Sequence, residues 1–377
     1  RRSSDLMTDI NNPLSAVLDV SISEQGLEES TKPSSYAPMR HGKRTEALIA
    51  AGSRKTRSNL KLNTLGTAHI DIEGARITIE DFMLAKLEGL NLTTSKILQI
   101  IILYATREST KENQDLSFEL SFDYFAECTG ETFKSRMQKS RFKAEFFKAL
   151  ETISNIKIRM EGEVIKGEAI TIGNIPLMYY APVEGKKDTS KITIIKDFAD
   201  YLDLSYLMQF YKPILLISED GAHQFHTEYS YYFNQPRNHV PKGKGRIEQA
   251  RIFSIQKAIE WTGNLPTLEE VKNSNRAYAK RILDPLDDIL SHPHGMIKKW
   301  HFCKAKGEAL DKKEIKTYED IKSLYILVTE VREEADIKEK MYPAIGHILE
   351  RKEKKDAVKT RRVNKAKKLE EDKLEDV

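Results

Sequence analysis

Two stretches of this 377-residue chain repeat the same order of hydrophobic patterns, and this repetition constrains the fold more than any other feature. In the first stretch, residues 95–106 have the pattern of a largely buried helix, and residues 116–120 alternate like a short strand. Residues 122–128 return to helical spacing, and residues 139–154 carry one apolar stripe, typical of a helix packed on a core. At residues 156–172 the period changes from about 3.6 to about 2 residues, which predicts a two-stranded ribbon.

The second stretch is clearest in its middle and at its end. Residues 246–261 have a broad apolar side that predicts one helix, and residues 275–290 predict a further one. Because Pro285 cannot continue a straight helix, we expect a kink or a helix in two parts there. Residues 296–303 and 323–329 predict a second ribbon. Helix, short strand, helix, helix and ribbon is the order of a winged helix, so the sequence predicts an α+β protein with tandem winged-helix domains.

Composition sets the domain boundaries that we expect. Residues 1–68 are rich in Ser, Asn and Thr and show no sustained period, which predicts a mostly disordered N-terminal extension with a basic arm at residues 40–61. The first winged-helix domain is expected at residues 69–210 and the second at residues 211–335. Residues 336–377 are expected to form a charged C-terminal tail.

Cysteine usage and hydropathy indicate a cellular compartment. Cys128 and Cys303 lie far apart, in segments that predict helix and strand, which excludes a disulfide framework and indicates a reducing environment. The longest apolar run, residues 97–105, is about half as long as a bilayer span. Residues 1–13 lack the apolar core of a signal peptide. We therefore expect a cytoplasmic protein without a membrane partner.

A formal net charge of only +4, from 61 Lys and Arg against 57 Asp and Glu, hides a strong clustering of cations. Residues 133–143 hold five cations and no acid, residues 40–61 hold seven cations and one acid, and residues 351–369 hold ten cations and two acids. The two terminal stretches suit sequence-independent contact with phosphates, although each alone could equally be a solubilising end. A small net charge is therefore no argument against a nucleic-acid partner.

The basic positions at the helix starts are the candidate DNA contacts, because a recognition helix presents its first turns to base edges while nearby side chains hold phosphates. In the first domain, these residues precede or begin the third helix: Lys134, Arg136, Lys139, Arg141 and Lys143. In the second domain, they belong to a basic loop, to the helix over residues 275–290 and to the ribbon: Lys242, Lys244, Arg246, Asn275, Arg276, Tyr278, Lys280, Arg281, Lys298 and Lys299. One charged run is more often an ordinary solvated face, but recurrence at the same place in two copies favours DNA binding.

Several motifs resemble the bacterial plasmid replication initiators that are built from two winged helices. The motifs are Leu92-Thr93-Thr94-Ser95-Lys96, Thr152-Ile153-Ser154-Asn155-Ile156, Gly173-Asn174-Ile175-Pro176-Leu177, Lys191-Ile192-Thr193-Ile194, Phe198-Ala199-Asp200-Tyr201-Leu202 and Arg281-Ile282-Leu283-Asp284-Pro285-Leu286. The resemblance covers about residues 90–329. The N-terminal extension, the insertion at residues 220–246 and the chain after Val331 depart from the family pattern.

The resemblance implies sequence-specific binding to repeated origin sequences, called iterons, that initiates replication of a plasmid or related mobile element. It implies that the C-terminal domain makes most of the specific contacts, that the N-terminal domain joins dimerisation, and that the monomer initiates while the dimer represses. A host initiator and a helicase would be further partners, since the chain has no Walker A motif of its own. We expect no enzymatic activity, no cofactor and no metal.

Two other functions stay open at this point. A winged-helix transcriptional repressor or partition regulator would have the same fold. The segment His223-Gln224-Phe225-His226, followed by three tyrosines, resembles the motif of a relaxase or rolling-circle nickase. That function is less favoured, because histidines three residues apart do not point to one side of a strand and no acidic third ligand is near.

Two residue groups carry weaker signals. One is an aromatic cluster: Tyr229, Tyr231, Tyr232 and Phe233. These rings could stack on single-stranded bases, but such spacing is more typical of a core or a domain interface. The other contains ligand-type side chains: His292, His294, His301 and Cys303. Their spacing is not a zinc pattern, and we interpret them as turn and wing residues.

Overall fold

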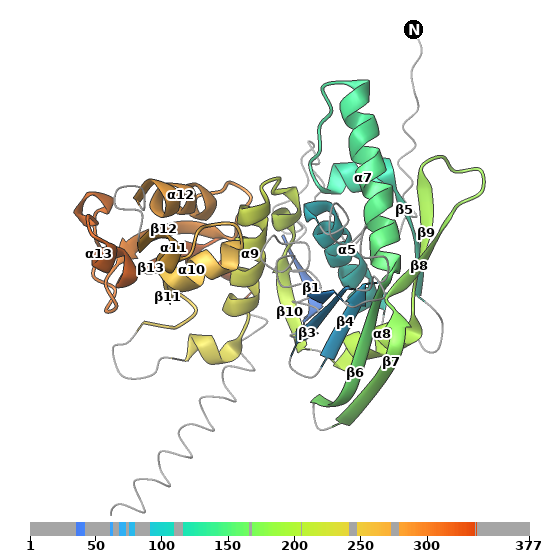
Figure 1. Cartoon of the computed structure of the whole chain (residues 1–377), viewed down its shortest axis with the longest axis horizontal. Helices are drawn as coiled ribbons and strands as arrows, with labels where there is room; N and C mark the ends of the chain where they lie inside the picture. Colours follow the sequence, from blue (N-terminus) through green and yellow to red (C-terminus); the bar gives the residue numbers. More distant parts are fainter. Residues whose placement is uncertain are drawn as a thin grey trace, which may run out of the picture.

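Helices and antiparallel strands form two halves that lie side by side, with α9 (Asp220–Phe233) at their junction (Figure 1). The structure, a computed structural model, describes residues 35–41, 61–62, 68–72, 75–79, 91–108, 116–165, 168–204, 206–240, 247–272, 279–335 and 337. The mixture of helix and strand agrees with the predicted α+β class. Among the helices in these ranges, none has both the length and the apolar character of a bilayer span.

The first half follows the predicted order of helices and its first strand. Its elements are α5 (Leu92–Glu108), β5 (Leu116–Ser121), α6 (Phe122–Cys128), α7 (Arg136–Ser154), β8 (Met178–Pro182) and β9 (Thr189–Ile194). Ser121 caps α6, since its hydroxyl accepts a hydrogen bond from the Tyr124 amide. α7 begins at Arg136 rather than at residue 139, because Ser135 is its N-cap.

The ribbon predicted at residues 156–172 forms, but it does not belong to the sheet that contains β5. The five-stranded sheet to which it belongs has the order β2 (Lys61–Leu62), β3 (Ala68–Ile72), β4 (Ala75–Ile79), β6 (Ile156–Ile165) and β7 (Glu168–Pro176). The neighbours of β5 are β9 and then β8, with Phe118 opposite Ile192. Alternation predicts a strand without identifying its partner, and for this reason the assignment of the ribbon to the winged helix was wrong.

The second half contains the second predicted ribbon. The elements after α9 are β11 (Ile252–Ser254), α10 (Ile255–Thr262), α11 (Leu268–Lys272), the π-helical turn η4 (Ala279–Leu283), α12 (Asp284–Leu290), β12 (Ile297–Cys303), α13 (Tyr318–Lys322) and β13 (Tyr325–Val331). β12 pairs with β13, with Cys303 opposite Tyr325, as predicted. Pro285 lies in the first turn of α12, directly after the π-helical turn, so the prediction of a helix in two parts is confirmed.

The single helix predicted over residues 246–261 is wrong. Residues Ile252–Ser254 form β11 on β13, and the Ser254 hydroxyl then accepts a hydrogen bond from the Lys257 amide at 3.3 Å to start α10. The helix that precedes this strand is α9, which lies in the stretch that the family resemblance leaves out. A strand of three residues is too short to disturb an apolar helix period, so only its pairing reveals it.

The two three-stranded sheets share one strand order. The second half has the order β11-β13-β12 and the first half has β5-β9-β8. In both sheets, the first strand in the sequence pairs with the last, and the last pairs with the middle one. In both halves, one helix precedes the first strand and further helices separate it from the second. The two halves thus share a strand order, although in the first half β8 and β9 provide it instead of the predicted ribbon.

A strand near the N-terminus corrects the predicted disorder of residues 1–68. β1 (Tyr36–His41) pairs along its whole length with β10 (Tyr206–Tyr211). The Met39 side chain is fully buried in the core. A six-residue segment that contains a proline shows too little alternation to predict a strand, and pairing with β10 together with burial of Met39 provides what the local pattern lacks.

β1 also connects the two halves. The Ser35 hydroxyl donates a hydrogen bond of 2.8 Å to Glu333 at the end of the second half. The Arg40 amide donates a hydrogen bond of 2.8 Å to the Thr106 hydroxyl on α5 in the first half. Residues 42–60 of the predicted basic arm, and the predicted tail apart from residue 337, lie outside the described residues.

A buried polar bridge joins α5 to α9 between the halves. Gln99 Nε2 donates a hydrogen bond of 3.1 Å to the Thr227 hydroxyl, and Gln99 Oε1 lies 3.0 Å from His223 Nε2. All three side chains are buried. Buried hydrophobic side chains of both halves belong to one continuous core. The two halves therefore present their surfaces in a fixed relation.

Candidate nucleic-acid interface

The start of α7 is a capped helix end that carries exposed cations. The Ser135 hydroxyl accepts a hydrogen bond of 3.1 Å from the Gln138 amide, and Gln138 Oε1 accepts one of 2.9 Å from the Lys134 amide. These bonds fix the backbone of the first turn. Four of the five predicted cations here are exposed and the last is half-buried: Lys134, Arg136, Lys139, Arg141 and Lys143.

Two of these five cations are held by carboxylates. Lys139 Nζ lies 2.7 Å from Asp123 on α6, and Lys143 Nζ lies 2.5 Å from Asp188 in the loop between β8 and β9. Three others form no ion pair with any described residue: Lys134, Arg136 and Arg141. A phosphate can therefore reach these three without displacing an acid.

The loop between β8 and β9 lies beside α7 and was missed by sequence reasoning. Asp188 in this loop has a φ of 60°, in the left-handed region, and its carboxylate holds Lys143. Lys186 Nζ pairs at 2.6 Å with Glu119 on β5, whereas Lys187 is exposed and makes no ion pair with the described part of the chain. Because the ribbon of the first winged helix was predicted at residues 156–172, this loop was assigned no role. Its signal was the turn sequence Glu184-Gly185-Lys186 between two alternating stretches.

The predicted cations of the second ribbon share one acid. Lys298 and Lys299 on β12 both contact Glu330 on β13, and Lys299 Nζ lies 2.7 Å from its carboxylate. Hydrogen bonds from Lys298 and then Lys299 lower the pKa of Glu330 to about 2. Both lysines are exposed, and exposed pairs of this kind exchange readily for another anion.

α12 is acidic, although the sequence predicts DNA contacts at the start of the helix that α12 ends. Lys312 Nζ lies 2.7 Å from Asp284 and 3.1 Å from Asp287, so one lysine from the 3-10 helix η5 (Lys312–Glu314) offsets part of the negative charge of this helix. Arg281, just before α12, is exposed. For Lys280 only the backbone is described, and the remaining predicted contacts lie outside the described residues: Lys242, Lys244, Arg246, Asn275, Arg276 and Tyr278.

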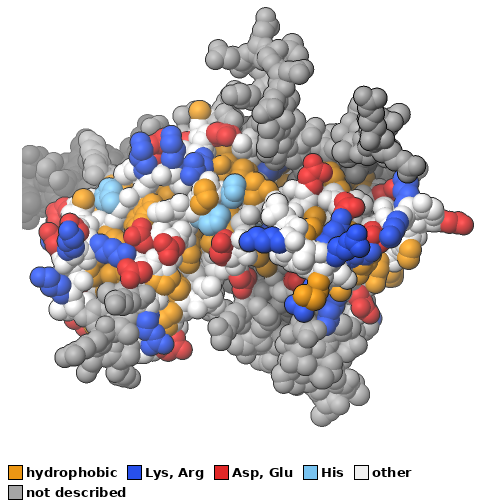
Figure 2. Space-filling model, turned by 90° about the horizontal axis from the view of Figure 1, so that it is seen from above, with side chains coloured by type: hydrophobic (Ala, Val, Ile, Leu, Met, Phe, Trp, Pro, Cys, Tyr) orange, Lys and Arg blue, Asp and Glu red, His pale blue; other side chains and the backbone are white. Residues whose placement is uncertain are grey.

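Figure 2 looks onto the end of the molecule where α7 begins and where α12 lies in Figure 1. Lys and Arg side chains appear on both halves of this face, with Asp and Glu between them. Because one core joins the halves, a rigid partner that touches α7 can also meet the second half on this side.

The histidines that resemble a nickase motif are structural. They lie on α9, where residues three apart do share a face, but that face is buried. His226 Nε2 lies 2.9 Å from the Ile289 carbonyl, and burial lowers the pKa of His226 to about 3, which keeps it neutral. A Cβ atom on Gly295 would come within 2.2 Å of His226 Nε2, so only glycine fits beside the ring.

The other ligand-type residues do not assemble either. His292 Nε2 lies 3.1 Å from Glu219, and Cys303 is buried, which raises the pKa of its thiol to about 11. Within the described ranges, no three His, Cys, Asp or Glu side chains are placed to hold a metal ion. Tyr229 is fully buried and donates a hydrogen bond of 3.2 Å to the Ala250 carbonyl, as the core interpretation of the aromatic cluster predicts.

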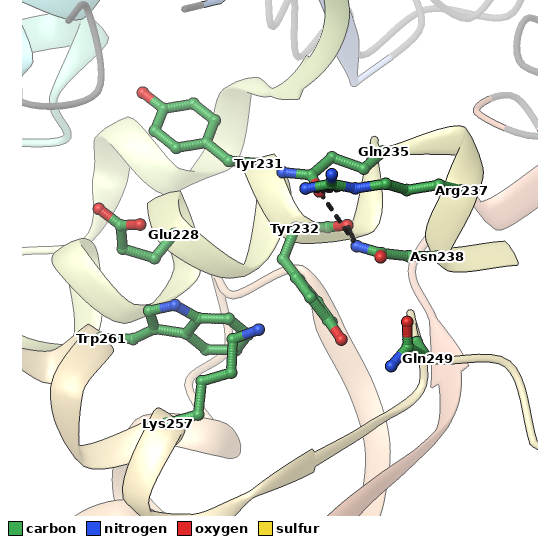
Figure 3. A pocket seen from close by; sticks show the side chains of 9 residues that line it. All are labelled: Glu228, Tyr231, Tyr232, Gln235, Arg237, Asn238, Gln249, Lys257 and Trp261. Atoms are coloured by element: carbon green, nitrogen blue, oxygen red, sulfur yellow. Dashed lines mark hydrogen bonds between the residues drawn. The ribbon is translucent and has the colours of Figure 1, made fainter. Parts of the chain in front are cut away.

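A cavity of about 480 Å³ opens in the second half, between the end of α9, the 3-10 turn η3 (Pro236–His239) and α10 (Figure 3). Aromatic, cationic and amide side chains line it, among them Tyr232, Gln235, Arg237, Gln249, Lys257 and Trp261. The sequence patterns did not connect these residues, because they meet only through the packing of α9 on α10. Of the aromatic cluster, Tyr232 is the member that stays partly exposed here.

In comparisons with known proteins, no model of a protein family matches this chain, and no curated protein matches its sequence.

Proposed function

We propose that the chain binds double-stranded DNA with two winged helices, one in each half. The observation that carries this proposal is the shared strand order, β5-β9-β8 and β11-β13-β12, with helices before the first strand and between the first and second strands of both sheets. A winged helix has this order, and the loop between its last two strands is the wing. The second supporting observation is the row of exposed cations at the start of α7.

In this proposal, α7 is the recognition helix of the first half and the β8–β9 loop is its wing. Arg136 and Arg141 lie in the helix turns that would enter a groove, Lys134 directly precedes the N-cap of this helix, and Lys187 lies on the wing, where phosphates pass. None of these four cations is paired with an acid among the described residues, so binding a phosphate costs no ion pair. The second half would use the helix that ends in α12, together with β12 and β13.

Two recognition helices on one side of a single core suit two successive turns of one DNA duplex, about 10 base pairs apart. Repeated short sequences satisfy such a protein better than one isolated site does. Together with the motif resemblance, this favours origin repeats as the target and initiation of replication of a plasmid or related mobile element as the role. The partners of this role would be a second copy of the chain, a host initiator and a helicase.

DNase footprinting on the DNA that flanks the chain's own gene tests this function. We expect protection of several short direct repeats. Protection of a single palindrome beside a promoter would instead identify a transcriptional repressor with the same fold. No protected region at low salt, with protein shown to be folded, would reject DNA binding altogether.

A matched pair of variants makes the footprint specific to the proposed surface. The combination of Arg136→Ala and Arg141→Ala removes two exposed cations of α7, and protection should require a much higher protein concentration. Lys196→Ala removes an exposed cation at the start of α8 (Lys196–Leu204), which is neither a recognition helix nor a wing in this proposal, and its footprint should match the wild type.

A further inference from the structure

The cavity at the end of α9 combines two aromatic walls with two cations (Figure 3). The rings of Tyr232 and Trp261 lie with centroids 5.2 Å apart at an interplanar angle of 56°, and both side chains are partly exposed. Lys257 Nζ lies 3.7 Å from the centroid of the Tyr232 ring and 5.1 Å from that of Trp261. The volume of the cavity, about 480 Å³, is typical of a site for a small molecule.

Neither cation of this cavity has a carboxylate partner within the described residues. Arg237 Nε and Nη2 both donate to Gln235 Oε1, at 3.1 and 2.8 Å, which leaves other guanidinium donors unused by this amide. Burial lowers the pKa of Lys257; Glu260 and Glu228 act against this change, while Arg237 adds to it. Arg237 and Lys257 line the same cavity, so an anion bound there would meet two positive charges.

We infer that this cavity binds a nucleotide unit, with its base against Tyr232 and Trp261 and its phosphate held by Arg237 and Lys257. Every base has a face that stacks on an aromatic ring, and a phosphate accepts hydrogen bonds from Arg and Lys. The ammonium of Lys257 covers the Tyr232 ring when no base is there, and it moves from the ring to the phosphate when a base enters. The Gln249 amide, also on the wall, offers a donor and an acceptor to a base edge.

An acidic peptide fits the cavity less well. A carboxylate would meet the two cations but would leave both aromatic faces unused. The same nucleotide chemistry has two sources, a free nucleotide and a strand of single-stranded DNA. The cavity is lined by α9, η3 and α10 and contains no residue of α7, so this inference does not depend on the proposed duplex binding.

Tryptophan fluorescence gives a direct measurement, because the chain has two tryptophans. Trp300→Phe leaves Trp261 as the single reporter, and a base stacked on that ring should quench it. The probes are dTMP, ATP and a single-stranded oligo(dT). We expect saturable quenching by all three if a free nucleotide is the ligand, and binding of oligo(dT) at least about tenfold tighter than dTMP if single-stranded DNA is the source.

Two variants test the assignment of the residues. In the Trp300→Phe background, Arg237→Ala truncates an exposed side chain and leaves the core unchanged, and Tyr232→Leu removes one of the two aromatic walls. Each should weaken the probe that binds by about tenfold or more, while Lys306→Ala should leave it unchanged. Urea unfolding of each variant checks that the variant is folded. If Tyr232→Leu does not fold, Arg237→Ala still tests the inference.

Three outcomes would overturn the inference: no quenching by any probe, quenching that neither variant weakens, or equally strong quenching by an oligo-Asp peptide. Duplex binding measured on the same proteins separates the two proposals. If Arg237→Ala loses nucleotide binding but retains duplex binding, both proposals are supported. If the wild type binds the nucleotide probes but no duplex, only the proposed function is rejected.

Discussion

Met137 has the most exposed large hydrophobic side chain among the described residues, with 63% of its surface accessible to solvent. It lies in the first turn of α7, next to Arg136 and Gln138. The only feature of the major groove that suits an apolar side chain is the methyl group of thymine. If α7 enters the groove as proposed, Met137 is the residue that can distinguish thymine from other bases there.

Met137→Ala should therefore weaken binding to the cognate duplex by about threefold to tenfold and remove a preference for thymine over uracil. The measurement compares affinities for duplexes that carry thymine or deoxyuridine at each position of the protected repeat. Leu207→Ala, which truncates an exposed side chain on β10, is the control and should behave as the wild type. Equal affinity of the wild type for all substituted duplexes would show that Met137 reads no thymine.

The unpaired arginines of α7 carry a prediction about salt. Arg136 and Arg141 are exposed and unpaired within the described residues, so each can neutralise one phosphate. Replacing both by alanine should reduce the slope of log affinity against log salt by about 2, because each phosphate contact contributes about 0.9. Affinity titrations at several salt concentrations measure this slope. A slope identical to that of the wild type would place these arginines outside the interface.

At the scale of elements, the spacing of apolar residues predicted the helices that depend on neighbouring residues in the sequence. The apolar stripe from Phe142 to Ile153 predicted α7, and the clustered cations predicted which end of it is chemically distinct. The pairing of β5 with β9 joins residues about 70 apart, and no local pattern encodes such a partner. The β8–β9 loop, β11 and the cavity between α9 and α10 were missed for the same reason, since each depends on contacts that are distant in the sequence.

β1 shows most clearly how a nonlocal contact overrides composition, and it supports a sharp test. Met39 points into the core whereas its neighbour Pro38 is exposed. Met39→Ala should lower the free energy of unfolding by about 2–5 kcal/mol, because it leaves a cavity beside α5 and β10. Pro38→Ala should change it by less than about 1 kcal/mol. Urea unfolding of both variants decides the matter, and two equally neutral substitutions would restore the predicted disorder of this segment.

At the scale of the whole molecule, the junction between the halves contains a buried cation. Lys96 lies on α5 and only 2% of its surface is exposed. Burial lowers the pKa of Lys96 to about 8, even though Glu131 and Glu219 both act to raise it. Glu219 precedes α9 in the second half, so the charge of Lys96 interacts with groups from both halves. Keeping this lysine charged at neutral pH therefore costs folding free energy at the junction.

The sign of this effect leads to a prediction about pH. Below about pH 8, Lys96 is protonated in both the folded and the unfolded chain, so the folding free energy that its buried charge costs is constant. Between about pH 8 and the ordinary pKa of 10.5, the unfolded chain holds more protons than the folded chain, so stability rises with pH. Lys96→Met should raise the free energy of unfolding at pH 7 by about 2–3 kcal/mol and flatten this rise. Urea unfolding between pH 7 and 9.5 measures both, with Lys306→Met as the exposed control. Cys303 and Tyr211, whose pKa values burial raises to about 11 and about 12, give the opposite slope in both proteins, so the difference between the wild type and Lys96→Met isolates the contribution of the lysine. Parallel stability curves for the wild type and Lys96→Met would show that the lysine keeps its ordinary pKa and that the junction bears no such cost.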